Sequence, residues 1–95
     1  MVYKVEWTRD AKKSWEKLDK VMARKIKDKI DNELAKDLYG EGEELRGDLK
    51  GQWSFHFSGY RVIYEIFQSK LIIKILEVGS RQGKFYERVK RKYGR

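Results

Sequence analysis

The spacing of the apolar residues changes near Leu45, and this change limits the folds open to the chain. Before it, Met22, Ile26, Ile30 and Leu34 recur at every fourth position, as they would along one face of an amphipathic helix. After it, apolar and polar residues alternate in short runs, which is typical of strands with one buried face. The chain is therefore expected to combine helices with a sheet in an α+β domain.

Turn-forming residues divide the second part into three strands. The alternating runs cover residues 53–57, 60–67 and 71–78, and short polar turns at residues 58–59 and 68–70 separate them. Such spacing predicts a three-stranded antiparallel meander. Its aromatic residues are expected in the core more than in contact with bases; they are Trp53, Phe55, Phe57, Tyr60 and Tyr64.

Two helices and a further strand are expected before the meander. Residues 2–8 alternate as a strand, and Ala11, Trp15 and Leu18 share one face of a short helix. This helix and the next one along the chain are expected to form a hairpin. Glycines within residues 39–42 are expected to end the second helix, because glycine readily adopts the left-handed conformation found after a helix.

After the meander, Phe85, Val89 and Tyr93 are spaced as on one face of a short C-terminal helix. The expected order is β-α-α-β-β-β within a single small domain, residues 1–95. The helical hairpin is expected to pack against an antiparallel sheet, and the first strand to join that sheet at an edge.

The surplus positive charge is confined to the second half of the chain. The net charge of +8 arises there, because residues 1–48 hold 12 basic and 12 acidic side chains, whereas residues 49–95 hold 11 and 3. A solubilising charge coat would intersperse both signs along the whole chain. The asymmetry therefore indicates a surface that binds the phosphates of a nucleic acid.

Residue types that the sequence lacks exclude several classes of function. With no cysteine and one histidine, a disulfide, a thiolate nucleophile and a zinc site of usual composition are excluded, and no metal or cofactor is expected. The longest aliphatic stretch, Leu71 to Ile73, ends at Lys74, far short of the roughly 20 apolar residues of a membrane span. Because no apolar leader is present, a cytoplasmic protein without membrane contact is expected.

One face of the predicted sheet collects residues suited to phosphodiester chemistry. Ser54 and His56 alternate with the aromatic residues, Arg61 approaches them across the first turn, and Arg81 and Tyr86 follow the third strand. Cleavage of RNA without a metal needs a base for the 2′-OH, cations for the phosphorane and an acid for the leaving oxygen. The histidine, the two arginines and the tyrosine are residue types that can act as this base, these cations and this acid.

Simpler interpretations remain open for each of these residues. His56 can be an ordinary solvent-facing residue, and Arg61 can be a surface ion-pair partner. Arg81 and Lys84 can position phosphates without taking part in catalysis. The basic run that begins at Arg88 is the least specific element, since basic tails bind many polyanions.

Two short motifs lie along the predicted sheet: SGYRVIYEI at residues 58–66 and VGSR at residues 78–81. Together with Tyr86 they resemble the RelE/ParE superfamily of type II toxin components. Upstream, Leu45-Arg46-Gly47 and residues 49–54 are similar to the stretch before the sheet in RelE and YoeB toxins. The resemblance therefore covers nearly the whole chain.

The resemblance to RelE-type toxins implies a ribosome-dependent mRNA endonuclease that attacks through the 2′-OH without a metal. Position by position, the arginines of the two motifs are Arg61 and Arg81, and the C-terminal tyrosine is Tyr86 after a one-residue adjustment in spacing. The two strand lysines of the family fall on Ser54 and His56. This departure implies either lost activity or a histidine that acts as base or acid in place of a lysine.

Further contacts to RNA are expected from Lys50, Ser54, Lys84 and Arg88, with the lysines mainly holding phosphates. Glu43 falls near a glutamate that acts as general base in YoeB-type toxins, but its acidic surroundings are more simply explained as a solvated loop.

The resemblance also implies partners. They are the ribosome, mRNA and a cognate RelB-like antitoxin that forms a hetero-oligomer with this chain. Two alternatives stay open: a ParE-type inhibitor of DNA gyrase, and a basic RNA- or ribosome-binding module without catalysis. The joint presence of Arg61, Arg81 and Tyr86 favours the nuclease.

Overall fold

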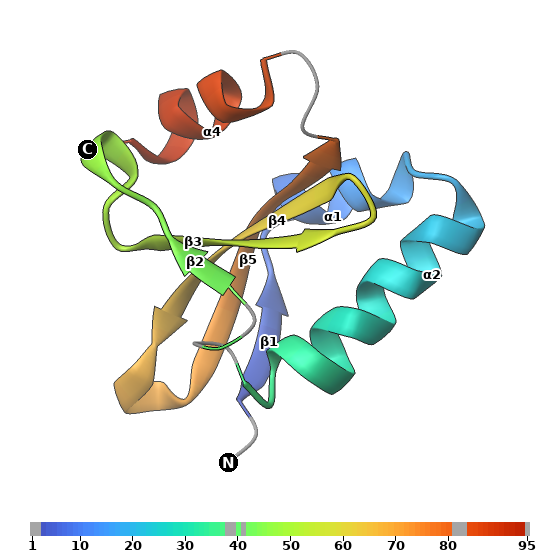
Figure 1. Ribbon diagram of the computed structural model, residues 1–95, viewed down its shortest axis with the longest axis horizontal. Coiled ribbons are helices and arrows are strands. Elements are labelled where there is room, and N and C mark those ends of the chain that lie inside the picture. Colours follow the sequence, from blue (N-terminus) through green and yellow to red (C-terminus); the bar gives the residue numbers. More distant parts are fainter. Residues whose placement is uncertain (1–2, 38–39, 41, 81–83, 95) are drawn as a thin grey trace.

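The computed structural model describes residues 3–37, 40, 42–80 and 84–94 as helices packed around one sheet (Figure 1). The predicted α+β class is confirmed, and the order of elements is as predicted except for one additional short strand, β2. The strands are β1 (Lys4–Trp7), β2 (Gly42–Glu44), β3 (Gln52–Phe57), β4 (Tyr60–Phe67) and β5 (Ile72–Ser80). The described helices are α1 (Arg9–Glu16), α2 (Lys20–Lys29) and α4 (Phe85–Tyr93), with a π-helical turn η1 (Ile30–Leu34) after α2 and 3-10 turns η2 (Gly47–Leu49) and η3 (Gln68–Lys70).

The sheet has five strands in the order β1-β5-β4-β3-β2. Strands β3, β4 and β5 form the predicted antiparallel meander, and β1 joins the sheet at an edge as predicted, next to β5. The pairing of β1 with β5 is parallel, so the sheet is mixed, whereas the sequence predicted an antiparallel one. Parallel neighbours need a long crossover, which here consists of the helical hairpin and the rest of the sheet. The short β2, which pairs with β3, was not predicted.

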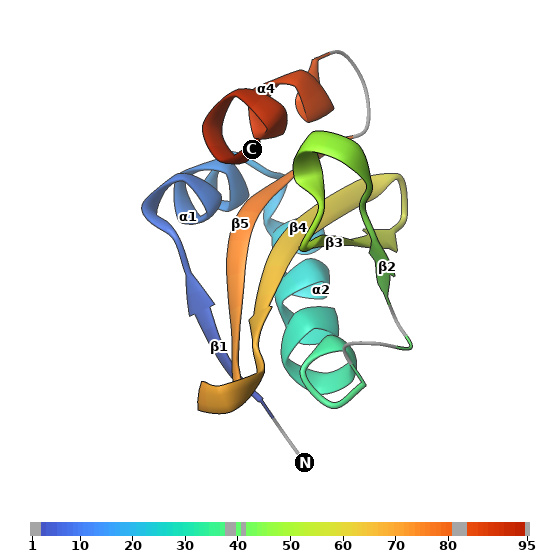
Figure 2. The same ribbon diagram turned by 90° about the vertical axis from the view of Figure 1, so that its left-hand side faces the viewer.

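One face of the sheet is covered by α1 and α2 (Figure 2). Of the predicted apolar stripe, Ile26, Ile30 and Leu34 have no exposed surface. Phe55 and Tyr64 are buried against them, and Trp53, Phe57 and Tyr60 pack partly buried around this core. The core assignment of the aromatic residues is therefore confirmed. Residues 2, 38, 39 and 41, on which parts of the expected first strand and helix end fall, lie outside the described residues.

The predicted C-terminal helix, α4, covers part of the opposite face and lies across one end of the sheet (Figures 1 and 2). Its buried residues are Phe85 and Val89, as the spacing predicted, and they pack with Leu49, Ile63 and Leu76. Full burial of such side chains stabilises a fold by about 1.5–3 kcal/mol each. Helix α4 thus buries part of this face and leaves the surface around His56 open to solvent.

A β-bulge in β5 shapes the surface beneath α4. Ile63 is the Cα partner of Glu77 and Tyr64 is the partner of Ile75, so Leu76 has no partner on β4. A bulge of this kind places two residues opposite one. Leu76 packs in the core under α4, and Glu77 faces the same helix through Lys92.

Candidate functional site

The hairpin of β3 and β4 brings His56 and Arg61 side by side. The two residues are Cα partners, and the connecting turn holds Ser58 at φ 51° and Gly59 at φ 84°. Two successive left-handed residues make a tight turn that keeps this register. Arg61 Nη1 contacts His56 Nε2. Because a guanidinium can only donate, Nε2 is the acceptor in this contact.

The first turn of α4 adds Tyr86 to this pair. Its ring centre lies 5.6 Å from the guanidinium carbon of Arg61, within the range of a cation–π contact. Its hydroxyl oxygen lies 3.4 Å from Ser54 Oγ, a long hydrogen bond. Ser54, His56, Arg61 and Tyr86 therefore form one group, which we name the Arg61 cluster.

Members of the Arg61 cluster differ in their access to solvent. His56 is exposed, and Arg61 and Tyr86 are half-buried, so these three side chains can meet a bound nucleotide. Ser54 is only 2% exposed. In this structure Ser54 orients the Tyr86 hydroxyl and offers little surface for direct contact with RNA.

A glycine in β5 sets the distance between α4 and the sheet. Gly79 is the Cα partner of Arg61, and the Phe85 ring lies against it. A Cβ at this position would lie 3.0 Å from the ring carbons Cδ1 and Cε1, closer than nine in ten real Cβ contacts. Glycine therefore permits the close approach of α4 that brings Tyr86 to Arg61.

Other basic residues expected at the site stand at the start of α4. Lys84 precedes this helix and Arg88 lies one turn into it, and both are exposed. The guanidinium carbon of Arg88 lies 5.9 Å from the centre of the Phe85 ring, so its charge is held close to the Arg61 cluster. Arg81, which was expected to be catalytic, lies outside the described residues.

The segment between β2 and β3 contributes Lys50 and Arg46. Lys50 is exposed and lines a surface hollow of about 670 Å³ together with Glu43 and Arg46. Arg46 also lines a second hollow, of about 420 Å³, that Tyr86 borders. Arg46 thus connects the surface near Lys50 with the Arg61 cluster. Sequence reasoning did not select Arg46 as a site residue, and its only signal was its place in the Leu45-Arg46-Gly47 segment.

Strand β2 brings Glu43 to the same side of the sheet as Ser54. The two residues are Cα partners, and partners in antiparallel register share a face. Glu43 is exposed, so its carboxylate stays accessible beside the cluster. The residue belongs to a strand here, whereas the sequence indicated a solvated loop.

The part of the chain that the structure describes offers neither a cluster of metal ligands nor a membrane-spanning helix. No group of three or more histidine, aspartate or glutamate side chains there is arranged to hold a metal ion. Each helix in the same part is too short or too polar to cross a membrane.

Comparisons with known proteins lead to one group of toxins. The model of the ParE toxin family, described as the ParE toxin of the type II toxin-antitoxin system parDE, matches residues 5–85. A protein of Escherichia coli named as a RelE-like toxin is 34% identical over 88 residues, which cover 86% of this chain and 86% of that protein.

Solved structures share the fold. A chain of the toxin-antitoxin complex RelBE2 from Mycobacterium tuberculosis has a TM-score of 0.82 and 26% identity, and the match covers 85% of this chain and 100% of that chain. A chain of the intact RelBE toxin-antitoxin complex from Escherichia coli has a TM-score of 0.73 and 25% identity, with 85% and 99% covered.

Proposed function

Because the chain belongs to the ParE toxin family and is a toxin component of the RelE/ParE superfamily of type II toxin-antitoxin systems, we propose that it is a ribosome-dependent endoribonuclease that cleaves mRNA. The observation that carries this proposal is the Arg61 cluster. In it an arginine, an imidazole and a phenol from two distant parts of the sequence converge on one surface. These are the groups that RNA cleavage through the 2′-OH requires.

The proposed reaction begins when a ribose 2′-oxygen attacks the neighbouring phosphorus. A bond forms between the 2′-oxygen and phosphorus, and the bond from phosphorus to the 5′-oxygen breaks. The products are a 2′,3′-cyclic phosphate and a 5′-hydroxyl. The 2′-OH proton passes either to the phenolate form of Tyr86 or to His56 Nε2, which first exchanges its contact with Arg61 for one with the 2′-OH, and an acid returns a proton to the leaving 5′-oxygen.

The cations have separate roles in this proposal. Arg61 stabilises the charge that develops on the phosphorane, since it is half-buried and adjoins both proton-transfer groups. Arg81 acts on the leaving group, as the resemblance implies. Lys50, Lys84 and Arg88 are exposed and hold the backbone phosphates of the RNA.

The open geometry of the cluster supports a requirement for the ribosome. His56 is exposed at the surface of the sheet, so the chain alone leaves a nucleotide free to take many orientations. In-line attack requires the 2′-oxygen, the phosphorus and the leaving oxygen to be aligned. We propose that the ribosome supplies this alignment and that the substrate is mRNA held in its decoding site.

A RelB-like antitoxin is the proposed protein partner. Two of the matched structures are toxin-antitoxin complexes, RelBE2 and RelBE. An acidic segment that folds as it binds would suit the net charge of +8 on this chain. Growth arrest on expression of this chain alone, and its relief by the antitoxin, would support the pairing.

Substitutions read in an in vitro translation assay test the nuclease directly. Arg61→Ala and Tyr86→Phe should each lower mRNA cleavage by about 10²–10³-fold, because each removes a group that acts in the transition state. Lys70→Ala is the matched control, since Lys70 is an exposed cation beyond the other end of β4, and it should cleave as the wild type does. His56→Gln separates the two candidate bases: unchanged cleavage would leave Tyr86 in that role.

Inhibition of DNA gyrase is a second candidate function, favoured by the matched family model, which is that of ParE. The two candidates give opposite results in two assays. If the wild-type chain blocked gyrase supercoiling and left translated mRNA intact, and if Arg61→Ala had no effect, the gyrase function would replace the nuclease.

A further inference from the structure

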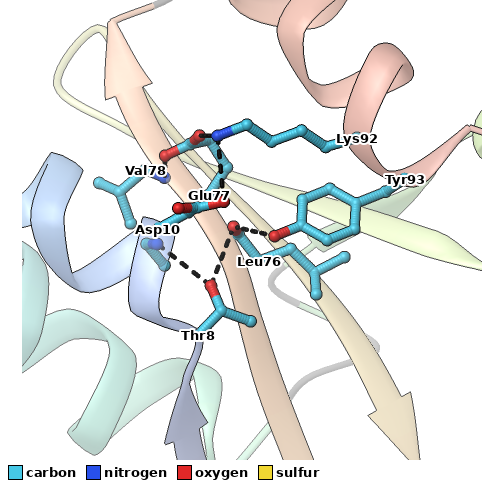
Figure 3. A network of polar contacts seen from close by, with 8 residues as sticks. Thr8, Asp10, Leu76, Glu77, Val78, Lys92 and Tyr93 are labelled. Atoms are coloured by element: carbon cyan, nitrogen blue, oxygen red, sulfur yellow. Dashed lines mark hydrogen bonds and ion pairs between the residues drawn. The ribbon is translucent and has the colours of Figure 1, made fainter.

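The last turn of α4 is tied to β5 and α1 by charged and polar contacts (Figure 3). Lys92 Nζ lies 3.2 Å from Asp10 Oδ2 and 3.6 Å from Glu77 Oε2. The Tyr93 hydroxyl donates to the Leu76 carbonyl at 3.2 Å. These contacts join the C-terminal end of the helix to residues from both halves of the chain.

The bulge in β5 makes the attachment of Tyr93 feasible. Leu76 has no partner on β4, and its carbonyl oxygen accepts hydrogen bonds from two side chains, Thr8 Oγ1 and the Tyr93 hydroxyl, each at 3.2 Å. Thr8 is also the N-cap of α1. One carbonyl thus links the start of α1 with the end of α4. The backbone carbonyl of Tyr93 is held as well, by Gln52 Nε2 at 2.8 Å.

Glu77 makes the position of Lys92 energetically important. Glu77 is 1% exposed, and its carboxylate accepts a hydrogen bond from the Val78 N–H in addition to the ion pair with Lys92. A buried carboxylate is costly unless it is paired. The hydrogen bond to Asp10 raises the pKa of Lys92 above its ordinary value of 10.5, and Glu77 acts in the same direction, so the ammonium is charged at neutral pH.

Lys90, on the same helix, is a natural comparison. Lys90 Nζ pairs with Asp48 Oδ2 at 3.2 Å, the same distance that separates Lys92 from Asp10. Both partners of the Lys90 pair are more than half exposed, and such pairs contribute little to stability. Lys92 differs because it also neutralises a buried carboxylate.

We propose that Glu77, Lys92, Tyr93 and the Leu76 carbonyl form a latch that positions Tyr86 for catalysis. A helix of nine residues behaves as a short rod about 1.5 Å long per residue, with Tyr86 in its first turn and the latch in its last. When the latch opens, the rod tilts on the core residues and carries the Tyr86 hydroxyl away from Ser54 and Arg61. Glu77 and Lys92 are therefore positioning residues, and only this final step rests on the proposed nuclease activity.

The test compares Lys92→Met with Lys90→Met by hydrogen exchange and by kinetics. In Lys92→Met, amides of α4 should exchange about tenfold faster while those of β3 to β5 keep their protection, because a local contact is lost and the sheet core is not. Turnover of mRNA on the ribosome should fall about 10- to 100-fold with KM unchanged, since a displacement of about 1 Å at a catalytic group has that effect. Lys90→Met should change neither quantity.

Two further variants decide whether the effect passes through Tyr86. In a Tyr86→Phe background, Lys92→Met should lower turnover no further, and Lys92→Arg should restore most of the activity because it returns the cation. Equal exchange rates in α4 for the Lys92→Met and Lys90→Met variants would overturn the latch. An additional loss of turnover in the Tyr86→Phe background would overturn its link to Tyr86.

The latch stays testable if the chain proves not to cleave mRNA. In that case the proposed function fails by itself, and the ring resonances of Tyr86, labelled with ¹³C, report its position. A shift of these resonances in Lys92→Met and none in Lys90→Met would support the positioning. Unshifted resonances in both variants would overturn it.

Discussion

The Arg61 cluster is assembled from two regions that are held in different ways. In the β3–β4 hairpin, backbone pairing and a two-residue turn bring His56 beside Arg61. Helix α4 has no such backbone pairing with the sheet. It is placed by buried apolar residues and by the side-chain contacts of its last turn. The hairpin half of the site is therefore fixed locally, whereas the Tyr86 half depends on long-range packing.

This difference predicts which half of the Arg61 cluster is displaced more easily. A side chain that strand register holds keeps its position unless the hairpin itself unfolds. Tyr86 can lose its place while the sheet stays intact, because in the described part of the chain its helix is held only by side chains: the buried Phe85 and Val89 and the polar contacts of its last turn. Variants that disturb α4 should therefore lower activity more than stability, and variants of the hairpin turn should do the opposite.

The substitution Gly79→Ala disturbs the half of the site that α4 provides, and it should lower activity more than a substitution in the hairpin turn. The added Cβ would lie 3.0 Å from two carbons of the Phe85 ring, so the ring has to give by a few tenths of an ångström, and we expect α4 and Tyr86 to shift outward with it. Turnover should fall about tenfold or more in the in vitro translation assay. The double variant Gly79→Ala/Phe85→Leu, with a smaller side chain on the helix, should recover part of this loss. Wild-type turnover in Gly79→Ala would show that the distance between α4 and the sheet does not control activity.

The sequence predicts the hairpin half of the site better than the helix half, for a physical reason. Strand alternation and the Ser58-Gly59 turn are local signals, and they were sufficient to place Arg61 near His56. The spacing of Phe85 and Val89 predicted a helix but not its position, since that depends on contacts between residues far apart in the chain. Ser54 was expected to face RNA, and only the packing of α4 shows that it is buried.

Other features left no pattern in the sequence. Strand β2 is acidic and has no apolar alternation, and its Gly42 has no space for a side chain beside the Tyr64 phenol. The bulge at Leu76 arises from the pairing register of β4 and β5, and the residue types at this position do not predict it. Arg46 lies at the site because the segment of β2 and the η2 turn packs beside α4, and this packing left no pattern in the sequence.

Gly59→Ala disturbs the hairpin half and should have the smaller effect on activity. Gly59 adopts φ 84°, a conformation that costs an L-residue roughly 1 kcal/mol or more. The free energy of unfolding, measured by urea denaturation, should fall by about that amount, while turnover per folded molecule stays unchanged because strand pairing persists. Ser58→Gly is the control: Ser58 already has a positive φ of 51°, so glycine should not lower stability. A large loss of turnover in Gly59→Ala would contradict local control of this half.

The chemistry of the cut ends tests the central claim most directly. The wild-type chain would be added to a translation reaction, and both ends produced by cleavage of the mRNA would be identified by mass spectrometry. Attack by the 2′-OH, with Arg61 and Tyr86 at the phosphorus, predicts a 2′,3′-cyclic phosphate on the upstream fragment and a 5′-hydroxyl on the downstream fragment, with both ends lost in Arg61→Ala. A 3′-hydroxyl and a 5′-phosphate, or uncut mRNA with the wild-type chain, would contradict the proposed function.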